Sequence, residues 1–346
     1  DHECATMEDA LAKLQRGQFF MIREGTAARN LEALAPLLTP QYAERCMFCT
    51  DDKHPSDLLE KGHIDYIARE AINKYGVDPI IAVKAACHHA ARYFLLNNRG
   101  AIAPGYLADF AVIDNFKDFN VEMVFKKGVL YWADGKLKDF AEPQIEEYLD
   151  HRAHDTFHVS KLTPDDFRDT RQRGVLGMIP GEIITTDNGY ADHVDLDRDI
   201  LKIAVIERHK NTHHIGLGYI QGYGLKSGAV ATSISHDSHN IIVVGTNSTD
   251  MAAAANHIVE HHGGIVVMEN GEVKGEVVLE IAGIMSDRPL TEINTELEAA
   301  KTAAFDLGVS RGIDPFMTLS FMALPVSPKL RITTRGVVDV DTQQYV

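Results

Sequence analysis

The first 95 residues alternate between short apolar runs and segments in which apolar residues recur with helical spacing. The runs 18–22 and 45–50 have the length and composition of buried β-strands. Thr6, followed three residues later by an acid, is typical of a helix N-cap, and Gly17 is expected to end that helix. Further helices are predicted over residues 27–38, 55–75 and 79–94. This alternation predicts parallel β/α units, so the expected fold class is α/β.

Polar residues stand where these predicted strands end. The segments are Asp1-His2-Glu3, Met21 to Gly25 and Cys46 to Pro55, and each is followed by a helix-like stretch. The carboxyl ends of the strands form the active-site face of a parallel β/α barrel. We therefore expect the chain to begin inside a catalytic domain, with these polar residues sharing one site.

The pattern changes after residue 95. Short β segments at 110–113, 121–125 and 129–132 are separated by Asp-Asn, Lys-Gly and Asp-Gly pairs, which favour turns. Residues 141–175 are rich in charge and histidine, and are expected to be a linker with some helix. From 176 to 346 a mixed α/β domain is predicted. Its strands are expected at 200–205, 228–234, 241–245 and 264–268, with a helix at 249–262 and an Asn-Gly hairpin at 269–272.

Composition narrows the class of protein. The chain has 346 residues, 45% of them hydrophobic, and a net charge of -16, which disfavours nucleic acid and anionic membranes as partners because like charges repel. No apolar run approaches the roughly 20 residues that span a bilayer, and no signal-like segment opens the chain, so the cytoplasm is the expected location. Four cysteines in a chain of this length do not suggest a disulfide framework.

Several zinc and nucleotide motifs are incomplete. Cys46 and Cys49 are three positions apart on a predicted strand and face opposite sides, which favours two buried thiols over a zinc knuckle. Cytidine-deaminase-type zinc enzymes need H-x-E and P-C-x-x-C, whereas here Glu3 directly follows His2 and Arg45 precedes Cys46. The glycines of 216–222 miss the G-x-G-x-x-G spacing. His213 and His214 are either a second metal site or ordinary core or surface histidines.

The hexapeptide Ser235-His236-Asp237-Ser238-His239-Asn240 lies between two predicted strands. Imidazoles and a carboxylate concentrated in one short segment are costly to bury without partners. The segment is therefore either a polar binding or proton-relay site, for which His236, Asp237 and His239 are the candidates, or a well-satisfied turn. A Ser-His-Asp triad is disfavoured because residues so close in sequence rarely reach the required geometry.

These motifs resemble a known family. Thr50-Asp51-Asp52 with a downstream His-Pro, Gly62-His63-Ile64-Asp65 and the run from Gly100 to Asp109 resemble the later part of an amidohydrolase-superfamily enzyme. Asp1 to Cys4, Ile22 to Gly25 and the hexapeptide are similar to bacterial-type adenine deaminases. The resemblance implies the C-terminal part of a (β/α)8 barrel at 1–95, a small β-sandwich segment at 96–140, the linker at 141–175 and the C-terminal α/β domain of that family at 176–346.

The resemblance also implies the site. His2 and Asp51 match metal ligands, the metal being a dinuclear centre of Mn or Fe, and Asp51 would also be the catalytic general base. The alternatives are a surface histidine and a helix-capping aspartate. Asp52 would either accept a hydrogen bond from the purine N7-H or cap the helix near Pro55. Further substrate contacts are expected from Glu3, Arg23, Glu24, His236, Asp237 and His239, although an Arg-carboxylate pair that only positions the loop is an alternative for Glu3, Arg23 and Glu24.

The implied activity is hydrolysis of adenine, a small-molecule substrate, to hypoxanthine and ammonia in purine salvage, by a homo-oligomer. About three strand-helix units precede residue 95, whereas a full barrel has eight in about 250 residues. The superfamily's His-x-His, bridging acid and further His have no counterpart here, so we expect a fragment whose independent activity is doubtful. The rivals are an amidohydrolase for another cyclic amidine or amide, and a non-catalytic remnant that binds a ligand or mediates oligomerisation.

Overall fold

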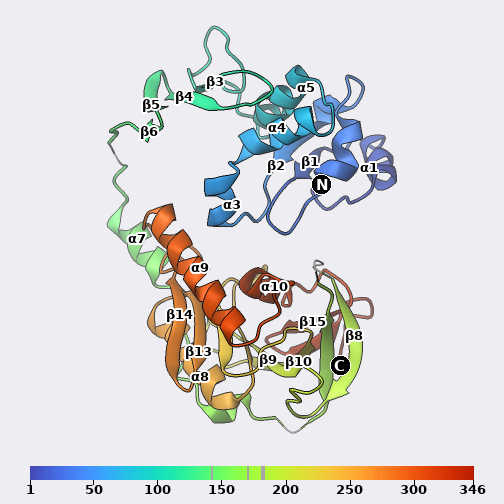
Figure 1. The fold of residues 1–346 in the computed structure, drawn as a ribbon, viewed down its shortest axis with the longest axis vertical. Helices are drawn as coiled ribbons and strands as arrows, with labels where there is room; N and C mark the ends of the chain where they lie inside the picture. The colour runs from blue at the N-terminus through green and yellow to red at the C-terminus, as the bar shows by residue number, and fades with distance from the viewer. Residues whose placement is uncertain (142, 170, 181–183) are drawn as a thin grey trace. The chain divides into compact units, whose positions relative to one another are not determined.

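The computed structural model describes residues 1–141, 143–169, 171–180 and 184–346. They form two compact units, Asp1–Pro143 and Gln144–Val346 (Figure 1). Both units contain helices and strands, in agreement with the mixed α/β class predicted from the sequence. Among the described residues no helix is both long and apolar enough to cross a membrane.

The first unit contains a pair of parallel strands with helices packed around it. Strand β1 (Phe20–Arg23) pairs with β2 (Cys46–Cys49), so that Phe20 lies opposite Cys46 and Arg23 opposite Cys49. Helices surround the pair and bury apolar residues such as Leu31, Leu34 and Ile67 against it. These helices are α1 (Met7–Leu14), α2 (Leu31–Leu34), α3 (Pro55–Glu60), α4 (Ile64–Asn73), α5 (Pro79–Val83) and α6 (His89–Tyr93), with one π-helical turn (Lys84–His88) between the last two.

Two of the predicted helices differ from the structure. The stretch predicted as one helix over 55–75 is divided into α3 and α4, because Gly62 adopts a φ of 102° and the Asp65 carboxylate accepts a hydrogen bond from the His63 N-H at 2.7 Å. The stretch 27–38 is α-helical only over Leu31–Leu34, since Arg29 forms a β-bridge with Glu24. The N-cap prediction is confirmed, as the Thr6 hydroxyl accepts from the Asp9 N-H at 3.3 Å.

A four-stranded antiparallel sheet follows, in the order β3 (Phe110–Ile113), β4 (Val121–Lys126), β5 (Val129–Ala133) and β6 (Lys136–Leu137). The two tight turns are built on Lys127-Gly128 and Asp134-Gly135, all four with positive φ. This is the backbone that a two-residue hairpin turn requires, so the turn residues were correctly read from the sequence.

The second unit is organised by an eight-stranded sheet in the order β14-β13-β11-β12-β9-β10-β7-β8. Only β10 and β7 pair in parallel, and all other neighbours are antiparallel. The strands are β7 (Arg173–Met178), β8 (Thr185–Ala191), β9 (Ile200–Ile206), β10 (Ile215–Gln221), β11 (Ala229–Thr232), β12 (Ile241–Gly245), β13 (Gly264–Glu269) and β14 (Glu272–Val278).

Both faces of this sheet are covered. Helix α8 (Ser248–Glu260) packs on one face, while α9 (Leu290–Asp306) runs along β13 and β14 on the other with α10 (Pro315–Phe321), as Figure 1 shows. A small sheet of β15 (Leu330–Thr333), β16 (Gly336–Asp339) and β17 (Gln344–Tyr345) adds to the second face, and α7 (Glu147–His154) precedes the sheet in the chain. All seven residues of β9 are consequently buried; six are apolar, and the exception, Lys202, donates through Nζ to the Phe167 carbonyl at 2.9 Å.

The predicted strands and hairpin of this unit are confirmed, with Asn270 and Gly271 both at positive φ in the β13-β14 turn. The glycine-rich stretch 216–222 is largely the strand β10, which was not predicted. A Cβ on Gly216 would overlap the Thr333 carbonyl, and one on Gly218 would overlap Val337. These glycines therefore allow the small sheet to approach β10 closely and do not form a phosphate-binding loop.

Candidate metal and substrate site

Four of the residues predicted to share a site lie together at the carboxyl ends of β1 and β2. The Arg23 guanidinium donates through one nitrogen, Nη1, to Asp51 Oδ1 and to Glu3 Oε1, both at 3.1 Å. His2 Nε2 lies 2.9 Å from Glu3 Oε1 and 3.8 Å from Asp51 Oδ1. The side chains of Arg23 and Asp51 are only 10% and 17% exposed, so this ion-pair network is shielded from solvent on one side.

The local backbone explains this convergence. Asp51 follows the end of β2 with a φ of 56°, and its Oδ2 accepts from the Asp52 N-H at 2.9 Å. The buried Asn30 side chain accepts from the Arg23 N-H at 2.6 Å and donates to the Cys4 carbonyl at 2.9 Å. Asn30 thereby ties the end of β1 to the segment that carries His2. Sequence reasoning missed Asn30, because the helix predicted over 27–38 included it, whereas in the structure Asn30 is the N-cap of α2.

The remaining acids of the first unit are arranged differently. The Glu24 side chain is mostly buried, and its carboxylate lies 3.9 Å from Arg29 Nε. This ion pair is with Arg29 and is separate from the Arg23 network. Burial raises the pKa of Glu24 above its usual value. Helix α3 begins at Pro55 with His54 as its N-cap, so neither Asp51 nor Asp52 is the capping residue. The capping interpretations of these two acids are therefore wrong.

Lys53 is a further polar residue of this segment that sequence reasoning passed over. Its Nζ is buried, lies 4.8 Å from the centroid of the Tyr66 ring and has no hydrogen-bond partner within the described part of the chain. Burial lowers the pKa of Lys53, while the negative charges of Asp57, Asp65 and Glu24 oppose that shift. Its position directly after Asp51-Asp52 was the signal available in the sequence.

The hexapeptide 235–240 is a turn of the second unit. The His236 N-H donates to the Ser320 carbonyl at 3.1 Å, and the His236 ring stacks on Phe321 at 4.7 Å between centroids. The His239 N-H donates to the Ser235 carbonyl at 2.6 Å, and the rings of His236 and His239 lie edge to face. The Asp237 side chain is 83% exposed. The two imidazoles are thus partly enclosed, while the carboxylate points to solvent.

A buried arginine holds this turn. Arg208 donates through Nε to the His239 carbonyl, through Nη1 to the Thr156 carbonyl at 2.9 Å and through Nη2 to the Ala282 carbonyl at 2.8 Å. Its guanidinium also lies 4.2 Å from the centroid of the Phe157 ring. Burial lowers the pKa of Arg208 to about 10, and it remains charged at neutral pH. The sequence offered no signal for Arg208, because its partners are far from it along the chain.

The other sequence candidates do not cluster. Burial raises the pKa of Cys46 to about 12 and of Cys49 to about 11, so neither is a reactive thiolate at neutral pH. His213 Nε2 pairs with Asp166 Oδ1 at 3.0 Å on the surface. Neither pair belongs to a group of three potential metal-binding side chains among the residues that the structure describes.

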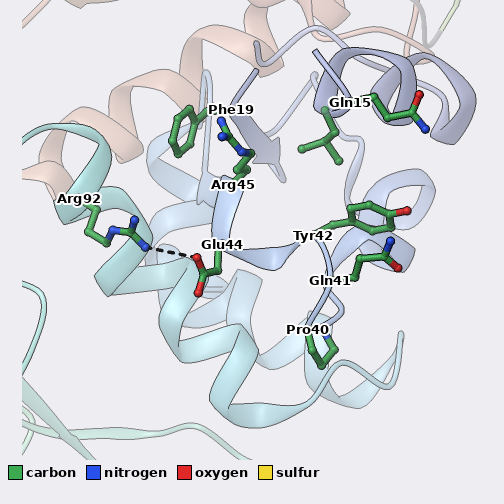
Figure 2. Close-up of a pocket in the computed structure, with 9 residues that line it drawn as sticks. Gln15, Phe19, Pro40, Gln41, Tyr42, Glu44, Arg45 and Arg92 are labelled. Atoms are coloured by element: carbon green, nitrogen blue, oxygen red, sulfur yellow. Dashed lines mark ion pairs between the residues drawn. The ribbon is translucent and has the colours of Figure 1, made fainter. Parts of the chain in front are cut away.

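A cavity of about 500 Å³ lies at the other end of the same strands (Figure 2). It is lined in part by Phe19 and Arg45, which directly precede β1 and β2, and by Glu44, whose Oε2 is 3.7 Å from Arg92 Nη1. The polar network of Arg23 and Asp51 is at the opposite, carboxyl ends of these strands. Active sites of parallel β/α folds lie at the carboxyl ends, so this cavity is not the candidate site.

Comparison with known proteins agrees with the resemblance noted in the sequence. Residues 182–344 match the family model of the adenine deaminase C-terminal domain, and residues 13–131 match that of the amidohydrolase family. These matches confirm the resemblance to the adenine deaminases. The segment that matches the amidohydrolase model contains Arg23, Glu24, Asp51 and Asp52, and the segment that matches the adenine deaminase C-terminal model contains the hexapeptide.

Individual relatives cover the whole chain. The adenine deaminase of Nitratidesulfovibrio vulgaris (strain DP4) is 42% identical over 363 residues, which cover 100% of this chain and 61% of that protein. The adenine deaminase of Desulfatibacillum aliphaticivorans is 42% identical over 360 residues, with the same two coverages of 100% and 61%. The chain therefore spans about three fifths of the length of these curated relatives.

Among solved structures, the β-aspartyl dipeptidase of Fervidobacterium islandicum AW-1 is 24% identical to this chain. The match covers 39% of this chain and 36% of that protein, with a TM-score of 0.32. A score of this size does not establish a common fold.

Proposed function

We propose that the protein containing this chain hydrolyses adenine to hypoxanthine and ammonia. The observation that carries the proposal is the convergence of His2, Glu3, Arg23 and Asp51 at the carboxyl ends of β1 and β2. The relatives of 42% identity support the choice of substrate. In the same proposal the product enters purine salvage in the cytoplasm, and the enzyme is a homo-oligomer.

The proposal includes an architecture. Residues 1–95 are the last strands and helices of a (β/α)8 barrel, 96–140 belong to a small β-sandwich, 141–175 link these parts along the chain, and 176–346 are the C-terminal domain. The second compact unit nevertheless begins at Gln144, and its strand β7 begins at Arg173. The parallel pairing of β1 with β2 and the antiparallel sheet β3-β4-β5-β6 support the first two assignments.

The residues present fit a divalent metal. A metal held by one imidazole nitrogen and one carboxylate oxygen at about 2.0–2.2 Å requires those atoms to lie within about 4.4 Å of each other. His2 Nε2 and Asp51 Oδ1 are 3.8 Å apart and are N and O donors of the type that Mn and Fe accept. We therefore assign His2 and Asp51 as ligands of a divalent metal, in a dinuclear Mn or Fe centre. Such a metal, when bound, lowers the pKa of water and supplies hydroxide at neutral pH.

Asp51 is the proposed general base. Arg23 and the Asp52 N-H hold its two oxygens, so the carboxylate is oriented before substrate binds. Its remaining lone pairs are available to take a proton from the attacking water and to deliver it to the departing amine of adenine. Arg23 also pairs with Glu3, so its guanidinium holds the Asp51 and Glu3 carboxylates side by side.

The purine-binding residues are proposed from two places in the chain. Glu3, Glu24 and Asp52 supply acceptors for ring and exocyclic N-H groups, and Arg23 positions Glu3. In the C-terminal domain, His236 and His239 are held in a fixed turn by Arg208, while Asp237 faces solvent. We propose these three residues as further contacts of the substrate or its leaving amine, as the family resemblance implies.

The first test compares this chain with a version extended upstream to the full length of its relatives. We expect ammonia release from adenine only in the extended protein, because His2 and Asp51 supply too few ligands for a dinuclear centre. Activity of the 346-residue chain alone, with Mn²⁺ or Fe²⁺ supplied, would contradict this. Activity of the extended protein on another cyclic amidine, and none on adenine, would favour the rival amidohydrolase.

The second test is Asp51→Asn in the extended protein. The change removes a ligand charge and the proton acceptor together, so we expect kcat to fall by about 10²- to 10⁴-fold or more. Asp134→Asn is the matched control, since Asp134 is an exposed turn residue of the same unit whose φ of 57° suits asparagine. If Asp51→Asn lowers kcat no more than the control does, Asp51 is not the base.

A further inference from the structure

A cluster of metal-binding side chains lies in the second unit, away in sequence from every residue assigned above. His257, His261 and Glu276 each offer one ligand atom, and these atoms lie within 4.8 Å of one another. We infer that the three side chains bind a late first-row divalent metal ion such as Zn²⁺. Within the described part of the chain this is the one group of three such residues.

The positions of the two histidines follow from the helix. His257 is in the last turn of α8 and His261 is its C-cap, four residues later, where the His261 N-H still donates to the His257 carbonyl at 3.1 Å. Residues four apart lie on the same face of a helix, one turn above the other. The two rings accordingly stack, with centroids 4.1 Å apart and 30° between their planes.

The third ligand comes from a neighbouring strand. Glu276 lies on β14, and its Oε2 is 2.7 Å from His257 Nε2. Strand β13, which pairs with β14, packs against α8, so the helix and the hairpin are held together by their apolar residues before any metal binds. The ligands are thus placed by tertiary structure that does not depend on the metal.

The hydrogen bonds orient the donors for coordination. Nδ1 of His261 lies 2.9 Å from the His257 carbonyl, and because a carbonyl only accepts, this nitrogen carries the proton. Nε2 of His261 therefore has its lone pair available. Such a backbone contact fixes the tautomer and the ring orientation of a metal-binding histidine. The proton shared by His257 and Glu276 is the one that a metal ion would replace.

The donor set selects the class of metal. Imidazole nitrogen suits Zn, Cu and Ni, and one carboxylate with two imidazoles is a known zinc ligand set. Tetrahedral bonds of about 2.0–2.1 Å place neighbouring ligand atoms about 3.4 Å apart, so the cluster needs small side-chain rotations. Glu276 is 42% exposed and can make them. Three protein ligands leave one position for water or an exogenous ligand.

The alternative role is a clamp that joins helix α8 to strand β14 without metal. A clamp needs only the pair of His257 and Glu276, whereas a metal site also needs His261. His261→Ala therefore separates the two roles, because it removes one ligand and leaves the pair intact. His193→Ala is the matched control, since His193 is an exposed histidine of the same unit paired with Asp192 alone.

The experiment is metal binding by the full chain after treatment with a chelator. Zn²⁺ binding is to be titrated against a competing indicator, and Co²⁺ binding is to be followed by visible spectra. The melting temperature is to be measured with and without Zn²⁺. We expect wild type and His193→Ala to bind one more equivalent than His261→Ala, or to bind it at least about tenfold more tightly. We also expect a Zn²⁺-dependent rise in melting temperature that His261→Ala lacks.

The comparison of Zn²⁺ stoichiometry between wild type and variant cancels any metal bound through His2 and Asp51, because all variants retain these two residues. Equal stoichiometry, affinity and Zn²⁺-dependent melting in wild type and His261→Ala would overturn the proposal and leave the clamp. If His261→Ala does not fold, Glu276→Gln takes its place, because the amide keeps a hydrogen bond to His257 but loses the ligand charge. Unchanged Zn²⁺ binding in Glu276→Gln would equally overturn the proposal.

Discussion

Two buried arginines organise the polar residues of this protein. Arg23 joins Glu3 and Asp51, and Arg208 joins the carbonyls of Thr156, His239 and Ala282. A buried charge is costly unless it is paired and hydrogen-bonded, and the rigid fork of a guanidinium can serve several acceptors at once. Each arginine therefore determines the position of a loop that carries proposed substrate-binding residues.

The first prediction at this scale concerns Arg208→Lys. An ammonium cannot reach three carbonyls that lie around a planar fork, so at least one buried acceptor loses its partner. We expect the second unit to lose about 2 kcal/mol or more of unfolding free energy, measured by urea denaturation. Arg198→Lys, which changes an exposed arginine, is the control. Equal stability of the two variants would show that Arg208 does not hold the turn.

The second prediction concerns pH and Asp169. This carboxylate is only 6% exposed; desolvation acts to raise its pKa, but hydrogen bonds from Arg171 and Arg173 outweigh it and hold the pKa well below the usual value. A carboxylate whose pKa is lower in the folded than in the unfolded protein stabilises the fold at pH values above its unfolded pKa of about 3.9. This stabilisation is lost as the pH falls towards the folded pKa.

We therefore expect Asp169→Asn to be less stable than wild type at pH about 7, and the difference to shrink below pH about 4. Denaturation curves across this range measure it. A difference independent of pH would mean that packing, not charge, is responsible.

At the scale of elements, the loops after β1 and β2 depend on each other. Gly25 follows β1, and a Cβ there would overlap the Thr50 carbonyl and lie 2.7 Å from the Asp52 carbonyl. Thr26 N-H also donates to the Asp52 carbonyl at 2.9 Å. The loop that carries Asp51 is thus packed directly on the backbone of the loop after Arg23.

Gly25→Ala should therefore destabilise the first unit and displace Asp51. Two backbone carbonyls cannot move aside as a flexible side chain can, so we expect a loss of about 1–3 kcal/mol. Gly312→Ala, whose Cβ would meet only the Ser310 hydroxyl at 3.7 Å and Pro180 at 4.0 Å, is the control. Thermal denaturation measures both, and a Gly25→Ala protein as stable as this control would contradict the packing argument.

At the scale of the whole molecule, the two units differ in how complete their sheets are. The second unit, Gln144–Val346, has an eight-stranded sheet with a core on each face. In the first unit the described parallel sheet has only two strands. Parallel sheets are normally larger and covered on both faces, which agrees with the proposal that β1 and β2 belong to a larger barrel.

The last prediction is that residues 144–346 fold alone. Their core is made within the unit, so we expect one cooperative transition in thermal or urea denaturation, with native-like circular dichroism. The reference is the transition assigned to this unit in the full chain. A peptide that is unfolded or aggregated at low temperature would show that the unit depends on the first 143 residues.

Local signals were sufficient for much of this protein. The N-cap at Thr6, the turns at Asp134-Gly135 and Asn270-Gly271, and the apolar strands β9 and β12 depend on neighbouring residues, and the structure has them where the sequence predicted. The position of Asp51 directly after an apolar strand was likewise predicted from neighbouring residues. Local patterns likewise led to the prediction that Asp51, Arg23, Glu3 and His2 gather at one end of parallel strands.

Tertiary structure alone decided the rest. Arg208 meets the turn 235–240, His257 meets Glu276, and Gly216 lies under Thr333, all through contacts between distant parts of the chain. The strands β7, β8 and β10 were missed because glycine and polar residues hide their pattern, while their pairing partners supply the stability. Periodicity and turn chemistry depend on a few adjacent residues, whereas pairing, burial and ligand geometry depend on which elements pack together.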